Sequence, residues 1–170
     1  PLNFSINNNL FKNLWDQKVI EIFESVSKKG KYIDKKFNCN IIWGDARKRI
    51  CDIPKHVKFD LIFLDGFSPQ KCPELWTKEF LTRIKQYLNN RGYLITYSSS
   101  AAVRKTLMDL GLRIYKIKPE IETSVNWSDG TIAVLNPYDD EYKKNSFLKN
   151  LSIMELEHLE TKASIPYRDP

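Results

Sequence analysis

Long apolar segments are absent from this sequence of 170 residues. No run approaches the roughly 20 residues that a helix needs to cross a bilayer, so we expect no membrane partner. Residues 1–9 are polar and rich in asparagine, unlike a secretory signal, and we therefore expect a cytoplasmic location. Hydrophobic residues nevertheless make up 42% of the chain, which excludes a protein that is disordered throughout.

Disulfide and metal-binding patterns are also absent. Cys39, Cys51 and Cys72 are odd in number and form no C-x-x-C spacing, which favours reduced thiols. His56 and His158 lie far apart and near no cysteine pair, so we expect no metal. The net charge of +6 would attract a phosphate backbone. Many proteins carry such a charge without binding nucleic acid, so the charge alone is weak evidence for a nucleic-acid partner.

Predicted helices and strands alternate along the chain. Apolar residues at helical spacing predict one or two helices between about Phe4 and Lys28, closed by Gly30. Strands are predicted at Asn40–Trp43, Phe59–Leu64, Tyr93–Tyr97, Leu112–Ile117 and Thr131–Leu135. Further helical segments are predicted at Ala46–Cys51, Lys78–Leu88, Ala101–Leu110 and Ser152–Glu160, with a turn at Asn89–Gly92.

This order predicts an α/β protein with a mostly parallel sheet and an antiparallel terminal hairpin, because no helix separates the last two strands. The strand Phe59–Leu64 is almost wholly apolar and is expected to be buried on both faces. One domain is expected over residues 1–140, with residues 141–170 as a polar C-terminal extension of it.

Polar residues follow three of the predicted strands, where parallel sheets bind their ligands. Asp45, Asp65 and Ser98 occupy these positions. Asp45 alone is best explained as a turn residue or helix cap. Asp65 is a stronger candidate, because Gly66 next to it would let a ligand approach the backbone.

The loop after Asp65 carries two aromatic residues, Phe67 and Trp76, between stiffening prolines. Such a loop can form a shaped pocket wall. The alternative is that both aromatic rings fold back onto the following helix.

Several motifs in this chain resemble one known family. Residues Phe59–Thr77 resemble the pattern F-D-x-x-F-L-D-G-F-S-P-x-x-N-P-x-x-W-T, with Cys72 in place of the asparagine. Gly44-Asp45-Ala46 matches a G-D-A motif, Ala101–Leu112 resembles V-R-x-x-L-x-x-x-G-F, and Ile165–Pro170 reads I-P-Y-R-D-P. The family is the methyltransferase domain of the bifunctional tRNA 5-methylaminomethyl-2-thiouridine biosynthesis enzyme and its stand-alone relatives.

The resemblance implies a Rossmann-like class I methyltransferase that uses S-adenosyl-L-methionine. Its implied substrate is the amine of 5-aminomethyl(-2-thio)uridine at the tRNA wobble position, and its implied partners are tRNA and an oxidoreductase domain or protein. Asp45, with Gly44 and Ala46, would bind the adenine of the cofactor, and Asp65 would face the substrate amine. The implied substrate-binding residues are Gly66, Phe67, Ser68, Pro69, Trp76 and Ser98.

Two departures from the family pattern qualify these expectations. The stretch Glu122–Gly130 replaces a G-x-K-R-E-M-like segment, although Trp127 could replace its stacking contact. None of the six glycines forms G-x-G, and the acidic residue that would hold the cofactor ribose is also missing. We therefore expect a partial domain that lacks the first two strands of the sheet and binds the cofactor weakly. The bared edge of the strand Phe59–Leu64 would then favour a homodimer.

Two other functions fit parts of the sequence. Aminopropyltransferases have a similar aspartate after the fourth strand and a G-D-A-like turn, but their polyamine substrates need no basic surface. A non-catalytic module that binds RNA or a protein is favoured by the missing glycine-rich loop.

Overall fold

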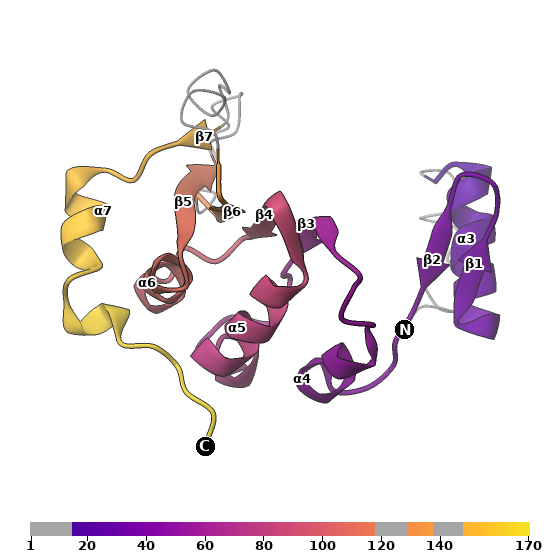
Figure 1. Ribbon diagram of the computed structural model, residues 1–170, viewed down its shortest axis with the longest axis horizontal. Helices are drawn as coiled ribbons and strands as arrows, with labels where there is room; N and C mark the ends of the chain where they lie inside the picture. Colours follow the sequence, from indigo (N-terminus) through magenta and orange to yellow (C-terminus); the bar gives the residue numbers. More distant parts are fainter. Residues whose placement is uncertain (1–14, 118–128, 138–147) are drawn as a thin grey trace. The chain divides into compact units, whose positions relative to one another are not determined.

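The computed structural model describes residues 15–117, 129–137 and 148–170 (Figure 1). It divides into unit 1, Pro1–Arg49, and unit 2, Ile50–Pro170, and each is described by itself. The predicted helical segment before Trp15 and the stretch 122–128 with Trp127 lie outside the described residues.

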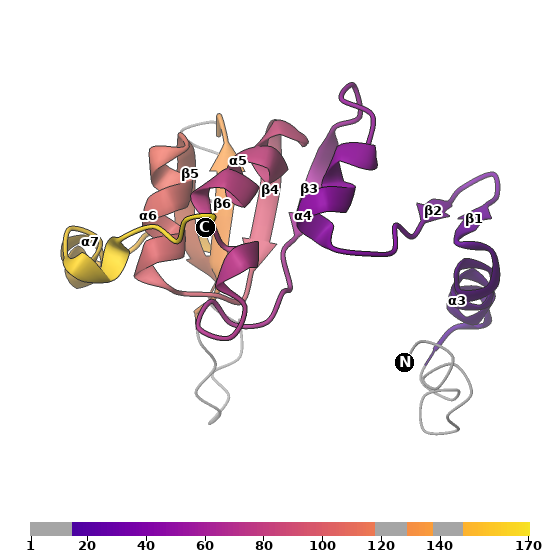
Figure 2. The ribbon, with the colours of Figure 1, turned by 90° about the horizontal axis from the view of Figure 1, so that it is seen from below.

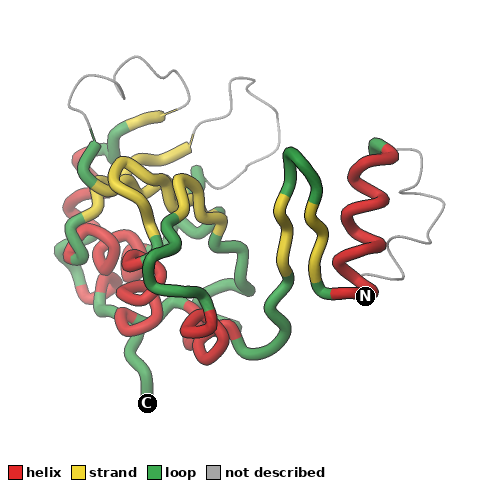
Figure 3. The backbone as a smooth tube through the Cα atoms, turned by 45° about the vertical axis from the view of Figure 1, so that its right-hand side comes forward, coloured by secondary structure: helices red, strands yellow, loops and turns green. Residues whose placement is uncertain are grey.

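Unit 1 consists of helix α3 (Gln17–Lys29), a two-stranded hairpin and the short helix α4 (Ala46–Arg49). Asp16 caps α3 by accepting a hydrogen bond from the backbone N of Lys18 at 2.7 Å. Gly30 ends the helix in the left-handed conformation with φ 72°, as predicted. The helix packs along the hairpin strands β1 (Lys31–Ile33) and β2 (Asn38–Asn40) (Figure 3).

The buried strand predicted at Asn40–Trp43 is wrong. The strand in this region is β2, which ends at Asn40 and pairs antiparallel with β1. Asp34 closes the turn between them by accepting hydrogen bonds from the backbone N atoms of Lys36 and Phe37, each at 2.7 Å. Among the described residues of unit 1, which start at Trp15, no further strand flanks the apolar residues that follow, and Trp43 is 65% exposed.

Unit 2 is built on a five-stranded sheet in the order β3-β4-β6-β5-β7. Its strands are β3 (Phe59–Phe63), β4 (Leu88–Thr96), β5 (Leu112–Ile117), β6 (Thr131–Leu135) and β7 (Leu148–Lys149). The β5–β6 hairpin is antiparallel, as predicted. The prediction of a mostly parallel sheet is wrong, because among the described strands only β3 and β4 form a parallel pair. Strand β6 lies between β4 and β5 and is antiparallel to both. Strands β3, β4 and β5 therefore run in the same direction, but β5 is not paired with either of the other two.

Helices α5 (Lys78–Gln86) and α6 (Ala101–Asp109) lie on the same side of this sheet (Figure 1). Thr77 caps α5 by accepting from the backbone N of Phe80 at 3.2 Å, and Gly111 follows α6 with φ 84°, as predicted. The helices and the sheet enclose a core that includes Phe80, Leu81, Ile84, Leu94, Val103, Leu107, Ile114 and Ala133. The predicted apolar stripe of α5 is therefore confirmed.

Strand β3 forms one edge of the sheet among the described residues, which agrees with the edge expected to be bared. The expectation that β3 is buried on both faces is wrong, because Leu61 is 47% and Phe63 is 69% exposed on one face, while Ile62 on the other face packs against the core. The turn predicted at residues 89–92 occurs inside β4 as an irregularity. Arg91 has φ 64°, and the pairing with β3 shifts there.

Residues 151–170, here called the C-terminal strap, pass α6 and reach α5 (Figure 2). The strap begins with helix α7 (Ile153–His158), whose N-cap Ser152 forms a capping box with Glu155. A helix of this length is not stable alone, so tertiary contacts must hold it in place.

The buried side chain of Arg104 fixes the start of the strap. Its Nε donates to Thr131 Oγ1 at 3.0 Å, its Nη2 donates to Gly130 O at 3.0 Å, and its Nη1 pairs with Glu155 Oε1 at 3.1 Å. Lys116 Nζ pairs with the other oxygen of Glu155 at 2.8 Å. Burial alone would raise the pKa of Glu155, but the hydrogen bonds from Lys116, Ser152 and Arg104 outweigh it and lower the pKa to about 2.

The end of the strap is fixed at the first turn of α5. The backbone N of Lys78 donates to Tyr167 O at 2.9 Å. Glu79 pairs with Arg168 Nε at 2.9 Å and accepts from the backbone N of Asp169 at 3.1 Å. The strap is thus held at both ends.

Replacing Glu155 with glutamine should loosen α7. The variant leaves Arg104 with an uncharged partner, a loss of about 1–3 kcal/mol that should accelerate amide exchange in residues 153–159 roughly 10- to 100-fold. Hydrogen exchange followed by mass spectrometry measures this, with exposed Glu157→Gln as the matched control. Equal exchange in the two variants would contradict the role given to Glu155.

Acid should release the strap only at very low pH. The pKa of Glu155 is lowered from 4.5 to about 2, so its contribution to stability is complete above pH 4.5 and is lost as the pH falls through about 2. In Lys116→Met the pKa should rise, because one hydrogen bond to the carboxylate is lost. Carbon NMR titration of the Glu155 carboxyl group in both proteins tests this, and identical titrations would contradict it.

Candidate functional site

Two aromatic side chains fix the backbone of the loop after β3. Trp76 Nε1 donates to Phe67 O at 2.8 Å, and the Tyr97 hydroxyl donates to Gly66 O at 2.7 Å. The two rings meet edge to face, with centroids 6.2 Å apart. Two neighbouring carbonyls of the loop are therefore held, one by Trp76 at the far end of the loop and one by Tyr97 after β4.

The two loop aromatics predicted to contact substrate have different environments. Trp76 is fully buried in the core at 0% exposure, so in this structure it positions the loop and offers no face for stacking. Phe67 is 76% exposed, and its ring projects from a fixed backbone. The alternative, in which the rings fold back onto the helix, is correct for Trp76 and wrong for Phe67.

Asp65 lies between buried Leu64 and Gly66, two residues after the end of β3. Its side chain is exposed, and no described residue bonds to its carboxylate. The absence of a side chain at Gly66 has a packing reason as well, because a Cβ there would lie 3.0 Å from Leu75 Cδ1. Packing against Leu75 is therefore a second reason for glycine at position 66.

A polar cavity of about 460 Å³ lies at the carboxyl ends of β3 and β4. It brings together the predicted residues Ser68, Pro69 and Ser98. Ser98 is 4% exposed and already bonded, since its carbonyl accepts from Thr131 Oγ1 at 2.6 Å and its hydroxyl accepts from the backbone N of Ser100 at 3.3 Å. The other lining residues are Gln70, Tyr97, Ser99, Ser100, Ala101, His158, Ala163 and Tyr167.

Sequence reasoning missed the contribution of the C-terminal strap to this cavity. His158, Ala163 and Tyr167 line it, although residues 141–170 were expected only as a polar extension. The I-P-Y-R-D-P motif, which contains Tyr167, was a usable signal. Nothing in the sequence pattern pointed to His158.

Asp45 belongs to unit 1 and has the capping role that its position suggested. The backbone N atoms of Lys48 and Arg49 donate to its carbonyl, which starts α4. The Arg47 guanidinium pairs with Asp45 Oδ2 at 3.0 Å, and this side-chain hydrogen bond lowers the pKa of the carboxyl group. Gly44 before it has φ 128°, a conformation that favours glycine.

The cofactor implied by the family pattern fits these residues in part. The Asp45 residue is exposed, and its Oδ1 already accepts from the backbone N and the Nε of Arg47. Oδ2 accepts one hydrogen bond, from Arg47 Nη2, and therefore keeps lone-pair capacity for an adenine amino group. Gly44 and Ala46 flank it without obstructing side chains, apart from Arg49, whose Cγ would lie 3.0 Å from a Cβ at Gly44. The sequence has no G-x-G turn to receive the methionine end.

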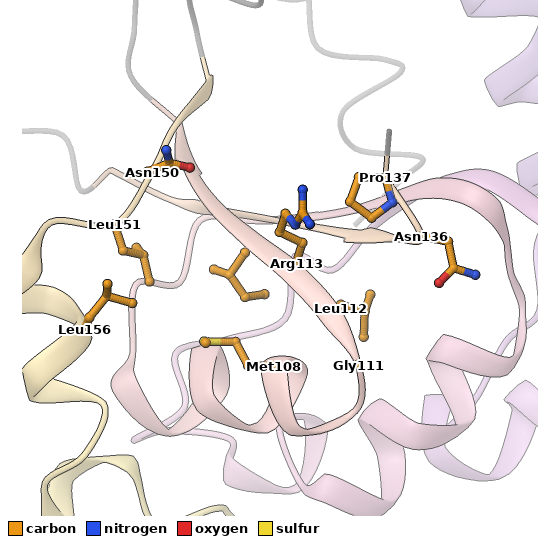
Figure 4. A pocket seen from close by; sticks show the side chains of 10 residues that line it. Met108, Gly111, Leu112, Arg113, Asn136, Pro137, Asn150, Leu151 and Leu156 are labelled. Atoms are coloured by element: carbon orange, nitrogen blue, oxygen red, sulfur yellow. The ribbon is translucent and has the colours of Figure 1, made fainter. Parts of the chain in front are cut away.

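A second cavity, of about 980 Å³, lies at the opposite end of the sheet (Figure 4). Its lining comes from the start of β5 and from residues after the reversed strands β6 and β7, including Leu112, Asn136 and Leu151. Its only charged lining residue is Arg113, and it contains none of the predicted site residues. The polar cavity is therefore the better candidate.

Two further features are absent from the described part of the chain. Within it, no helix is both long and apolar enough for a bilayer. No three His, Cys, Asp or Glu side chains of the described residues gather to hold a metal ion.

The chain is similar to a known protein family and to several known proteins. A family model described as S-adenosyl-L-methionine-dependent methyltransferase matches residues 9–123, more than half of the chain. The uncharacterized protein MJ0670 of Methanocaldococcus jannaschii is 33% identical over 133 residues, which cover 78% of this chain and 34% of that protein. A second relative is the tRNA 5-methylaminomethyl-2-thiouridine biosynthesis bifunctional protein MnmC of Campylobacter fetus. It is 30% identical over 119 residues, which cover 69% of this chain and 18% of that protein.

A solved structure shares the fold. The crystal structure of MNMC2 from Aquifex aeolicus aligns with a TM-score of 0.72 and 32% identity, over 91% of this chain and 47% of that one. The chain spans about a third or less of the two curated relatives named above. The family model and the shared fold point to the same family, and the aspartate after β3 fits it. The chain belongs to the S-adenosyl-L-methionine-dependent methyltransferase family.

Proposed function

We propose that this protein transfers a methyl group to the amine of 5-aminomethyl(-2-thio)uridine at the wobble position of tRNA. The observation that carries the proposal is the exposed, unbonded carboxylate of Asp65 at the carboxyl end of β3. Two residues further along the loop is the exposed ring of Phe67, and the next residues, Ser68 to Gln70, line the polar cavity. The name of the Campylobacter fetus relative concerns the same class of modified nucleoside.

The carboxylate suits an amine substrate. An alkyl ammonium cannot attack a methyl group, because its lone pair is occupied by a proton. Asp65 would accept that proton and orient the free lone pair toward the methyl group. The remaining requirement is in-line placement, which the fixed loop backbone provides through its bonds to Trp76 and Tyr97.

Phe67 and the basic charge suit an RNA substrate. An extruded base can stack on an exposed aromatic ring, and the fixed backbone of Phe67 limits the entropy lost when it does. The net charge of +6 provides attraction for tRNA phosphates.

S-Adenosyl-L-methionine, when bound, would supply the methyl group on its positive sulfur. Asp45 would bind the adenine amino group, with Gly44 and Ala46 beside it. Each of these assignments follows from the matched G-D-A motif and the exposed carboxylate.

An aminopropyltransferase fits the described site less well. A polyamine carries several ammonium groups and needs several carboxylates, whereas the polar cavity has no acidic residue in its lining. A non-catalytic RNA-binding module would use Phe67 and the basic charge but would have no use for a free carboxylate at Asp65.

Two partners belong to the proposal. An oxidoreductase domain or protein would act in the same pathway, in keeping with the word bifunctional in the relatives' names. A second copy of the chain would cover the edge of β3, where Leu61 and Phe63 are exposed.

Replacing Asp65 with asparagine should lower methyl transfer at least about 100-fold, because the amine loses its proton acceptor. The assay measures transfer of the labelled methyl group to undermodified tRNA. Asp60→Asn is the matched control, since Asp60 is an exposed carboxylate of β3 that accepts only from Asn89 Nδ2, at 2.8 Å. Equal activity of the two variants would remove Asp65 from the mechanism.

Replacing Phe67 with alanine should weaken tRNA binding by about 1–3 kcal/mol, the usual loss of one stacked base. Fluorescence anisotropy with an anticodon stem-loop measures the affinity. Phe37→Ala serves as the control, because this ring is 48% exposed on the hairpin of unit 1. Undiminished affinity of the Phe67 variant would contradict stacking.

A further inference from the structure

We infer that the C-terminal strap is part of the substrate site, and that His158 and Tyr167 contact the ribose and base of the bound nucleoside. The inference rests on the proposed function, because it assigns the polar cavity to the nucleoside that carries the amine. It goes beyond that function by naming a recognition surface on a segment that follows the whole sheet in sequence.

The cavity has two walls from distant parts of the chain. Residues after β3 and β4, such as Ser68 and Ser99, form one wall. The strap forms the other through His158, Ala163 and Tyr167. The strap therefore supplies the second wall of a cavity that stays open to solvent on its remaining side.

The chemistry of the lining selects a class of ligand. It contains hydroxyl, amide, imidazole and phenol groups, and no lysine, arginine, aspartate or glutamate. Phosphate would require cations and an ammonium group would require carboxylates. A ribose and the edge of a uracil base are neutral and carry many donors and acceptors, which these groups can match.

The order of residues along the loop then indicates where the substrate amine would lie. Asp65 and Phe67 lie outside the lining but precede Ser68 directly on the fixed loop. A nucleoside seated in the cavity can therefore direct a substituent of its base toward Asp65 while the ribose faces the strap.

The strap is rigid enough for recognition. Arg104 and Lys116 hold Glu155 one turn before His158, and Glu79 holds the segment directly after Tyr167. Lys105 also pairs with Glu160 at 2.7 Å. Arg104 is thus a positioning residue, since it fixes α7 without reaching the cavity lining.

The histidines provide a direct test. The protein has two, and His56 lies outside the cavity lining, so its ring is an internal control. The experiment adds 5-aminomethyluridine, or plain uridine, to the protein and follows the ring signals of both histidines by NMR. A His56→Gln variant assigns the two sets of signals.

We expect both nucleosides to shift the His158 signals saturably and to leave those of His56 in place. Tyr167→Phe should weaken this binding about 3- to 10-fold, since it removes one hydroxyl contact. Met154 lies on α7, the helix of His158, and is 79% exposed, so Met154→Ala should leave the nucleoside affinity unchanged. Unshifted His158 signals at saturating nucleoside would overturn the inference.

The outcomes separate this inference from the proposed function. Methyl transfer that depends on Asp65, with His158 signals that do not respond, would overturn the strap's role and keep the function. Responding His158 signals without any methyl transfer would keep the strap as a nucleoside-binding wall and overturn the proposed reaction.

Discussion

The buried guanidinium of Arg104 is the interaction on which the candidate site depends. It joins α6 to the start of β6 through Thr131 and Gly130, and to the C-terminal strap through Glu155. Because Thr131 also donates to Ser98 O, the same network reaches the end of β4. An unpaired buried guanidinium would be costly, so the strap is held by the need to satisfy this charge.

The site combines fixed backbone with free functional groups. Trp76 and Tyr97 use their polar atoms to hold two loop carbonyls, while the Asp65 carboxylate and the Phe67 ring stay exposed. This arrangement suits a reaction that depends mainly on placing an amine and removing its proton. It also explains why a motif with so many aromatic and proline residues lies in a loop.

Much of unit 2 could be predicted from the sequence, because its signals are local. The caps Thr77 and Gly111 mark their helices by their own chemistry. The bared edge of β3 was predictable from the missing glycine-rich loop, but the exposed face of β3 was not, since an apolar strand gives no information on which elements cover it. The burial predicted for Trp43 was wrong for the same reason, because no described strand of unit 1 covers it. The wall formed by His158 was not predictable either, because it depends on the Arg104–Glu155 contact between residues far apart in sequence.

The most direct test of the central claim is mass spectrometry of tRNA nucleosides after incubation of the protein with S-adenosyl-L-methionine and tRNA that carries 5-aminomethyl-2-thiouridine. The account predicts that the wobble nucleoside gains the mass of one methyl group and that no other nucleoside changes. Methylation at another nucleoside, or transfer to a polyamine in place of tRNA, would contradict it.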